Sequence, residues 1–324
     1  MNDLKTTFAG LVLKSPIIVS SSGLTNSASK NKKLEEAGAG AIVLKSLFEE
    51  QILLEADQIK DTAFSPEAND YLDQYMKEHK LAEYIDLIKE SKRLCTIPII
   101  ASINCYTDND WIEFASQIEE AGADALEINI LSLQTDLHYT YGTFEEHHIN
   151  ILSRIKKQVR IPIIMKLGNN LTNPIVLIDQ LYANGAAAVV LFNRFYQPDI
   201  DIEKLVHSSG EVFSNPADLS NTLRWVGIAS AQIEKIDYAA SGGVSRPEDI
   251  VKTILAGASA VEVCSAIYQK TNSFIKECNV FLATWMMHKG YHSIADFRGK
   301  LNAKKIQGIN TFERTQFLRY FNKK

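Results

Sequence analysis

Eight short segments rich in β-branched and apolar residues alternate with segments of helical pattern along most of the chain. The expected strands cover residues 16–20, 41–45, 98–103, 125–130, 162–167, 187–192, 236–240 and 260–263. The helices expected between them include residues 29–37, 109–121, 144–158 and 174–184. Such alternation is typical of a parallel sheet built from βαβ units. Eight strands favour an α/β fold of the (β/α)8 TIM-barrel type, with a doubly wound open sheet as the alternative.

Small residues precede four of the expected strands, in segments 37–40, 121–123, 184–186 and 256–258. Each segment contains a glycine, the residue that most readily ends a helix in a left-handed conformation. We interpret the four segments as one architectural device, used where a helix gives way to a strand, and not as four binding sites.

The segment 236–268 contains two turns of the kind that bind phosphate. One strand runs into Gly242 and Gly243, which allow a tight turn whose N–H groups can approach an anion. A helix follows, and the next strand ends at Cys264 and Ser265, where another helix begins. Paired turns of this kind bind phosphate after the last strands of (β/α)8 barrels. The alternative is two sharp turns without a ligand.

The size and charge of the chain exclude several classes of protein. With 324 residues, 46% of them hydrophobic, the chain can form one barrel-sized domain or two smaller ones, and we expect a single domain spanning residues 1–324. A formal charge of −5 without a strong basic block argues against nucleic acid as a partner. No apolar run approaches the ~20 residues that a membrane span requires, and the N-terminus lacks the apolar centre of a signal peptide. We therefore expect a cytoplasmic protein that does not bind membranes.

Cysteines and histidines do not indicate a metal site. Four cysteines are widely spaced without a CxxC pair, so we expect reduced thiols and neither zinc nor an iron–sulfur cluster. His147 and His148 are adjacent, and on a helix they would point in different directions. We interpret His147 and His148, like the nearby His138 and Glu146, as solvated residues around the start of a helix.

Three long connections follow the second, fourth and sixth expected strands, at residues 47–77, 131–143 and 195–219. In a barrel this places them at the C-terminal face, where long loops usually form lids or substrate walls. For residues 195–219, disorder is the alternative because the segment is polar.

Polar residues also occur at the C-terminal ends of the expected strands. They are Lys45, Ser46, Asn104, Glu127, Asn129, Lys166 and Asn193. Two lysines and three amides at one rim suit a flavin ring, whose pyrimidine edge gains negative charge on reduction. Each residue alone could be a hydrogen-bonded core group, and a Schiff-base aldolase would also need a strand lysine such as Lys166.

Several short motifs match one family along nearly the whole chain. They are Ser20-Ser21-Ser22-Gly23, Leu44-Lys45-Ser46, Leu126-Glu127-Ile128-Asn129, the run 162–167, Gly242-Gly243, Cys264-Ser265 and the tail 290–301. With these motifs the chain resembles the dihydroorotate dehydrogenase family, and most closely its soluble class 1 branch. The resemblance implies a barrel with non-covalent FMN that oxidises dihydroorotate to orotate, a step of pyrimidine biosynthesis, and commonly a homodimer.

The same resemblance implies roles for individual residues. The flavin ring and ribityl chain would contact Ser22, Gly23, Lys45, Ser46, Asn104, Asn129, Lys166 and Asn193, and the phosphate would contact Asn221, Gly242, Gly243, Cys264 and Ser265. Lys45, Asn129 and Asn193 would also hold the substrate. A base on the loop after the fourth strand would remove a proton from substrate C5 while C6 delivers hydride to flavin N5.

The chain departs from the family pattern where the substrate would bind. Ser132 stands at the position of the base, where class 1 enzymes have cysteine, and a serine needs a partner or a water chain to accept a proton. A loop serine without a catalytic role is the alternative. The family's substrate loop is replaced by residues 61–69, which lack most of its amides. Arg194 follows Asn193 and suits a substrate carboxylate or an acid of the long loop. Asn221 stands where the family has glycine, and asparagine tolerates a left-handed turn.

Two functions remain open at this point. The first is an FMN-dependent oxidoreductase that passes electrons from dihydroorotate, or a related carboxylated cyclic substrate, to a soluble acceptor such as fumarate or to an NAD-linked partner. The second is a flavin-binding protein that has lost turnover of dihydroorotate.

Overall fold

Eight parallel strands close into a barrel in the computed structural model, which describes residues 3–48, 66–104 and 111–305. This arrangement confirms the (β/α)8 barrel and excludes the open sheet, because β4 pairs with β6 and β13 pairs with β3 to complete the ring. The barrel strands are β3 (Ile17–Val19), β4 (Ala41–Val43), β6 (Ile99–Asn104), β7 (Ala125–Ile130), β8 (Ile163–Gly168), β9 (Ala188–Asn193), β12 (Asp237–Ser241) and β13 (Ala260–Val263).

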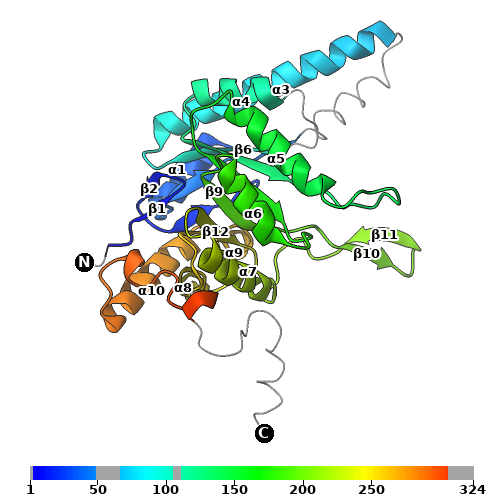
Figure 1. Cartoon of the computed structure of the whole chain (residues 1–324). Coiled ribbons are helices and arrows are strands. Elements are labelled where there is room, and N and C mark those ends of the chain that lie inside the picture. The colour runs from blue at the N-terminus through cyan, green and yellow to red at the C-terminus, as the bar shows by residue number, and fades with distance from the viewer. Residues whose placement is uncertain (1–2, 49–65, 105–110, 306–324) are drawn as a thin grey trace.

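Helices surround the barrel on its outer side (Figure 1). They are α1 (Ala28–Glu36), α3 (Pro66–Leu94), α4 (Trp111–Glu120), α5 (Thr143–Lys156), α6 (Pro174–Ala183), α7 (Asp218–Gln232), α8 (Pro247–Ala256), α9 (Ser265–Lys270) and α10 (Ser273–Lys289), followed by the 3-10 turns η1 (Ile294–Asp296) and η2 (Ala303–Lys305). The outward faces of the strands and the inner faces of these helices form the large hydrophobic core.

The N-terminal end of the barrel interior is apolar and closed. Ile18, Ile100 and Ile164 point into it together with small residues of the other strands. A short hairpin, β1 (Thr6–Phe8) and β2 (Leu11–Leu13), packs Phe8 and Leu13 against them. Because side chains alternate along a strand, residues two positions further on also point inward, toward the C-terminal face.

The turns between helices and strands confirm the interpretation of the glycine segments. Gly38, Gly122, Gly185 and Gly257 all have positive φ, from 90° to 128°, at the ends of α1, α4, α6 and α8. A polar side chain caps the start of α6. Asn173 accepts hydrogen bonds from the N–H groups of Ile175 and Val176 at the start of α6.

Two of the long connections contain regular structure that the sequence analysis did not predict. The expected loop 47–77 includes β5 (Leu47–Phe48) and the first turns of α3, while residues 49–65 lie outside the described part of the chain. The segment 195–219 contains the antiparallel hairpin β10 (Pro198–Asp201) and β11 (Val206–Ser209), which projects away from the barrel (Figure 1). The prediction of loops was therefore wrong for residues 66–77 and for the hairpin strands.

One histidine expected in a solvated helix start is instead fully buried. His148 is 0% exposed in α5, where its Nδ1 lies 2.7 Å from the carbonyl oxygen of Phe144 and its ring packs edge-on against the Phe144 ring. Burial lowers the pKa of His148 to about 4, so the ring is neutral in the folded protein.

His148 makes stability depend on pH. Its ordinary pKa is about 6.5, so between pH 6.5 and 4 the unfolded chain binds more protons than the folded one. We expect the free energy of unfolding to fall by up to about 3 kcal/mol over this range because of His148. Urea denaturation at several pH values should show a smaller loss in His148→Gln, which can still donate to Phe144. The variant His138→Gln, changed on an exposed loop, should keep the wild-type slope, and equal slopes in all three proteins would contradict the assignment.

Candidate active site

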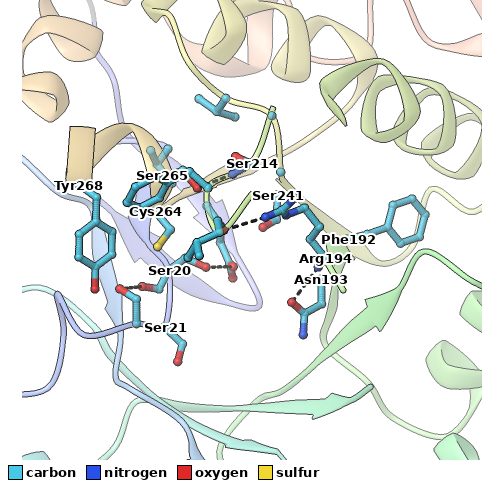
Figure 2. Close-up of a pocket in the computed structure, with 18 of the residues that line it drawn as sticks. Ser20, Ser21, Phe192, Asn193, Arg194, Ser214, Ser241, Cys264, Ser265 and Tyr268 are labelled. Carbon is cyan, nitrogen blue, oxygen red and sulfur yellow. Dashed lines mark hydrogen bonds between the residues drawn. The ribbon is translucent and has the colours of Figure 1, made fainter. Parts of the chain in front are cut away.

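A cavity of about 560 Å³ opens at the C-terminal ends of the barrel strands. Its walls come from the residues that follow β3, β4, β9, β12 and β13, as well as from β8. Figure 2 shows Ser20, Ser21 and Tyr268 on one side of it, and Phe192 and Asn193 on the other. The cavity therefore lies where barrel enzymes carry out their chemistry.

The turn after β12 presents unpaired backbone donors to this cavity. Gly242 and Gly243 have φ values of 95° and 74°, a conformation that favours glycine. The side chain of Asp249 accepts the N–H groups of residues 245 and 246, 3.0 Å away in each case. The N–H groups of Gly243 and Val244 have no hydrogen-bond partner among the described residues, and both residues line the cavity. They form a cradle suited to an anion.

The second expected anchor, at the end of β13, is tied to the loop that covers the cavity. The Oγ atom of Ser265 accepts a hydrogen bond of 3.0 Å from the N–H of Ser214 (Figure 2). Next to Ser214, Phe213 lies with its ring 5.7 Å from the ring of Tyr268, which belongs to α9. These contacts hold the segment after the β10–β11 hairpin against the rim, so the cavity has a wall on this side.

Three ionisable side chains meet inside the barrel beneath the cavity. The ammonium group of Lys166 lies 2.6 Å from Oε2 of Glu262 and 3.6 Å from Oε1 of Glu127. Ser20 donates a hydrogen bond of 2.7 Å to the same Glu262 oxygen. All four side chains are buried, and Ser20, Lys166 and Glu262 also line the cavity. A buried lysine of this kind is stable only because carboxylates surround it.

The two carboxyl groups differ in their protonation. Burial raises the pKa of Glu127 well above its usual value, and the nearby charge of Glu262 raises it further. Burial also acts to raise the pKa of Glu262, but Lys166 and hydrogen bonds from Glu127 and Ser20 hold it below its usual value. Burial acts to lower the pKa of Lys166, while the two carboxyl groups raise it. Of the two carboxyl groups, Glu127 is therefore the one that binds a proton more readily.

A chain of hydroxyl groups connects this cluster to the cavity rim. Ser102 donates to Glu127 over 3.3 Å, Ser46 lies 2.8 Å from Ser102, and Ser21 lies 2.9 Å from Ser46, in each case between side-chain oxygens. The hydroxyl of Tyr84, from α3, bonds both the N–H and the carbonyl of Ser102. The floor of the cavity is thus braced by hydrogen bonds on the side of β6 as well.

The remaining cations of the cavity have different surroundings. Lys45 makes no side-chain hydrogen bond or ion pair with the residues that the structure describes. Arg194 instead donates to the carbonyl oxygens of Glu211 and Val212, at 2.6 and 2.7 Å. Arg194 thus binds backbone of the long loop, where the sequence suggested a substrate carboxylate or an acidic partner.

Comparison with known proteins agrees with the barrel fold. The family model described as Dihydroorotate dehydrogenase matches residues 3–283. The chain belongs to the dihydroorotate dehydrogenase family. Two relatives carry the name dihydroorotate dehydrogenase B (NAD(+)), catalytic subunit. The one from Thermoplasma volcanium is 29% identical over 315 residues, which are 92% of this chain and 98% of that protein. The one from Methanocella arvoryzae is 30% identical over 281 residues, covering 82% and 87%.

Solved structures extend the likeness at the level of the fold. The crystal structure of DHODH from Eimeria tenella in complex with ferulenol matches with a TM-score of 0.66 and 16% identity, over 92% of this chain and 88% of that chain. At this identity the match supports the family's barrel and says nothing about substrate.

Most site residues expected from the family resemblance face one cavity. Those lining it are Ser22, Gly23, Lys45, Lys166, Asn193, Arg194, Gly242, Gly243, Cys264 and Ser265. Two more stand directly behind it. Asn129 is buried and accepts a hydrogen bond of 3.0 Å from Asn193, and Ser46 belongs to the hydroxyl chain. Their roles toward a dihydroorotate dehydrogenase ligand stay predictions.

The other expected site residues lie outside the lining of this cavity. Asn104 ends β6 and stands in register with Asn129. Asn221 lies within helix α7, so the left-handed turn expected there is absent. Ser132 lies on the loop after β7, where its carbonyl accepts a hydrogen bond from Asn170. Of the expected substrate loop 61–69, residues 61–65 are outside the described part of the chain and residues 66–69 belong to α3.

Several cavity residues escaped the sequence analysis. They are Phe48, Phe192, Phe213, Ser214, Glu262 and Tyr268. A signal existed for Glu262, because it is the one charged residue within an apolar strand of four. For Phe213, Ser214 and Tyr268 there was none, since a loop and a helix bring them to the rim only in three dimensions.

Gly243 has a second role that can be measured without a ligand. A Cβ atom at Gly243 would lie 2.2 Å from the backbone nitrogen of Leu219 in α7, whereas at Gly290, with a similar φ of 71°, it would meet nothing within 4 Å. We expect Gly290→Ala to cost about 1 kcal/mol of unfolding free energy, from backbone strain alone. Gly243→Ala should cost roughly 1–3 kcal/mol more, because α7 must also move. Urea denaturation followed by circular dichroism measures both, and equal losses would show that the close approach does not matter.

Proposed function

We propose that this chain, folded as a single domain, is an FMN-dependent dehydrogenase that acts on a CH–CH bond and oxidises dihydroorotate to orotate or a related carboxylated cyclic substrate. The observation that carries the proposal is the anion cradle of Gly243 and Val244, which faces the same cavity as Lys45 and Lys166. Family membership supports the reaction type.

The residues present fit FMN. Two N–H groups at a glycine turn, which have no partner within the described residues, suit its phosphate, and Ser22, Gly23 and Ser265 line the same cavity. A cavity of about 560 Å³ lies within the range of ligand pockets. Bound FMN would supply the ring that accepts a hydride from the substrate.

The chain's own side chains would orient the ring and the substrate. Lys166 is held in place by its ion pair, and Asn193 by its hydrogen bond to Asn129, so both are preorganised. The ammonium group of Lys45, which has no partner among the described residues, would bind an anionic substrate group. Asn129 and Arg194 would act as further substrate contacts, the latter with the part of its guanidinium that does not bind the loop.

Ser132 would act as the base that removes a proton from the substrate. Its Oγ atom accepts a hydrogen bond of 3.4 Å from the side-chain amide of Gln134. No carboxylate or histidine bonds to this hydroxyl within the described residues, so a water chain would have to carry the proton away.

The names of the relatives support a route for the electrons. The relatives from Thermoplasma volcanium and Methanocella arvoryzae are named as catalytic subunits of NAD(+) enzymes, and we propose that this chain likewise passes electrons to NAD(+) through a partner subunit. A soluble acceptor such as fumarate and a homodimer are the alternative arrangement. No helix in the described ranges is long and apolar enough to cross a membrane. A cytoplasmic setting is part of the proposal.

A second candidate function is a flavin-binding protein that has lost turnover of dihydroorotate. Two observations at the substrate side favour it. The guanidinium of Arg194 already donates hydrogen bonds to backbone carbonyls of its own chain. Among the described residues, no side chain bonds to Ser132 that could accept its proton.

The colour and reactivity of the purified protein separate these functions. We expect a yellow protein with one FMN per chain, whose absorbance bleaches under anaerobic conditions when dihydroorotate is added, because the substrate reduces the flavin. An oxidised spectrum that millimolar dihydroorotate leaves unchanged would support the second function. A colourless protein that does not take up FMN would contradict both.

Ser132→Ala tests the base directly. We expect the rate of anaerobic bleaching to fall by roughly 10²–10⁴-fold, the usual contribution of a general base, with FMN content unchanged. Stopped-flow absorbance measures this rate. Thr135→Ala removes a hydroxyl from the same exposed loop and should leave the rate as in the wild type. A wild-type rate in Ser132→Ala would show that another group accepts the proton.

A further inference from the structure

The cavity contains one carboxylate among its charged residues. The described residues that line it carry three cationic side chains, Lys45, Lys166 and Arg194, and a single acidic one, Glu262. A site that binds an anionic cofactor and an anionic substrate gains nothing from a carboxylate at its inner end. Glu262 therefore calls for a role of its own.

The shortest contact of Glu262 is with Lys166. Its Oε2 atom lies 2.6 Å from the ammonium group and accepts a further hydrogen bond from Ser20. Glu127 is farther from the ammonium group, at 3.6 Å, and one of its oxygens has no partner among the described residues. Since the side chains of Lys166 and Glu262 are 7% and 1% exposed, water screens this pair very little.

The net charge of the buried cluster follows from these contacts. Two carboxylates this close to one ammonium group cannot both stay ionised in a dry interior, so one retains a proton. Glu127 is that one, because it lies 3.6 Å from the ammonium group where Glu262 lies 2.6 Å away, and because burial and the charge of Glu262 raise its pKa. Lys166 contributes one positive charge and Glu262 one negative charge, and the cluster as a whole is neutral.

A neutral cluster affects a flavin differently from a lone lysine. Reduction places negative charge on the ring, and an unpaired cation nearby would stabilise the reduced form. We propose that Glu262, acting through Lys166, lowers the reduction potential of the bound flavin by cancelling the positive charge at the inner end of the cavity. This inference rests on the proposed FMN site. A lower potential makes the reduced flavin a stronger electron donor, which suits the NAD(+)-linked route proposed above.

Glu262→Gln tests this role while keeping the shape of the side chain. Glutamine can still accept from Lys166 and Ser20, so the floor of the cavity is preserved. With FMN bound, we expect the ratio of reduced to oxidised flavin at a fixed ambient potential to rise at least tenfold, on the order of what one charge produces in a poorly screened site. For a two-electron couple this is a shift of about 30 mV. Reductive titration against a reference dye measures it without turnover of substrate.

Glu127 provides a matched control within the same cluster. Glu127→Gln replaces a group that is already protonated, so the potential should stay within about twofold of the wild-type ratio. In Glu127→Gln/Glu262→Gln no carboxylate can take over, and the rise should be equal to or larger than that of Glu262→Gln alone. A larger shift in Glu127→Gln than in Glu262→Gln would overturn the assignment.

If Glu262→Gln does not fold or does not bind FMN, Glu262→Asp provides a second test. Aspartate keeps the charge but withdraws it from Lys166 by one methylene, so the potential should rise in the same direction by a smaller amount, roughly threefold in the ratio. An unchanged or lowered potential in a loaded variant would overturn the inference and leave the proposed function intact. A wild-type protein that does not bind FMN would overturn the proposed function itself.

Discussion

The buried contact between Lys166 and Glu262 is the constraint around which the upper half of the barrel is arranged. Neither charge is stable alone in an interior without water, so each strand that contributes to the cluster must hold its register. β8 brings Lys166, β13 brings Glu262 and β7 brings Glu127, all from positions two residues beyond the apolar layer. The transition from an apolar to a polar interior therefore occurs at one level of the barrel, and the cavity begins directly above it.

The walls of the cavity depend on backbone more than on side chains. The turn at Gly243 leaves two N–H groups without a partner in the described part of the chain, and the same glycine lets α7 approach within a distance that no Cβ atom would allow. Asp249 satisfies the next two N–H groups and starts α8. A single turn thus provides the cradle, the close contact with α7 and the start of α8, which leaves little freedom to change its sequence. The substrate side has no comparable constraint, since Ser132 and Arg194 are held by a few loop contacts.

This difference explains which parts of the site the sequence predicted. β7 and β13 have the bounds expected from their apolar runs, and the other barrel strands differ by one or two residues at an end, because burial on both faces leaves a continuous apolar pattern. The glycine turns were also predictable, because the local backbone conformation at the end of a helix determines where glycine is required. Glu262 was missed because its partner Lys166 lies in β8, across the barrel. The spacing of residues along the chain does not indicate that contact. Helix α3 was missed from Pro66 onward because a long loop was expected there, although helix-forming residues dominate the segment.

The two cavity lysines differ in a way that only their surroundings reveal. Lys45 follows β4 and has no partner within the described residues, so its full charge faces the cavity and can bind an anionic group. Lys166 is enclosed by carboxyl groups and presents hydrogen-bond donors with little net charge. If both lysines were unpaired, their repulsion in one small cavity would lower the stability of the empty protein, and the reduced flavin would be held too firmly to pass electrons on. Pairing one lysine with Glu262 relieves the repulsion. Under the proposed function, Lys45 would then attract the substrate and Glu262, through Lys166, would set the potential of the flavin.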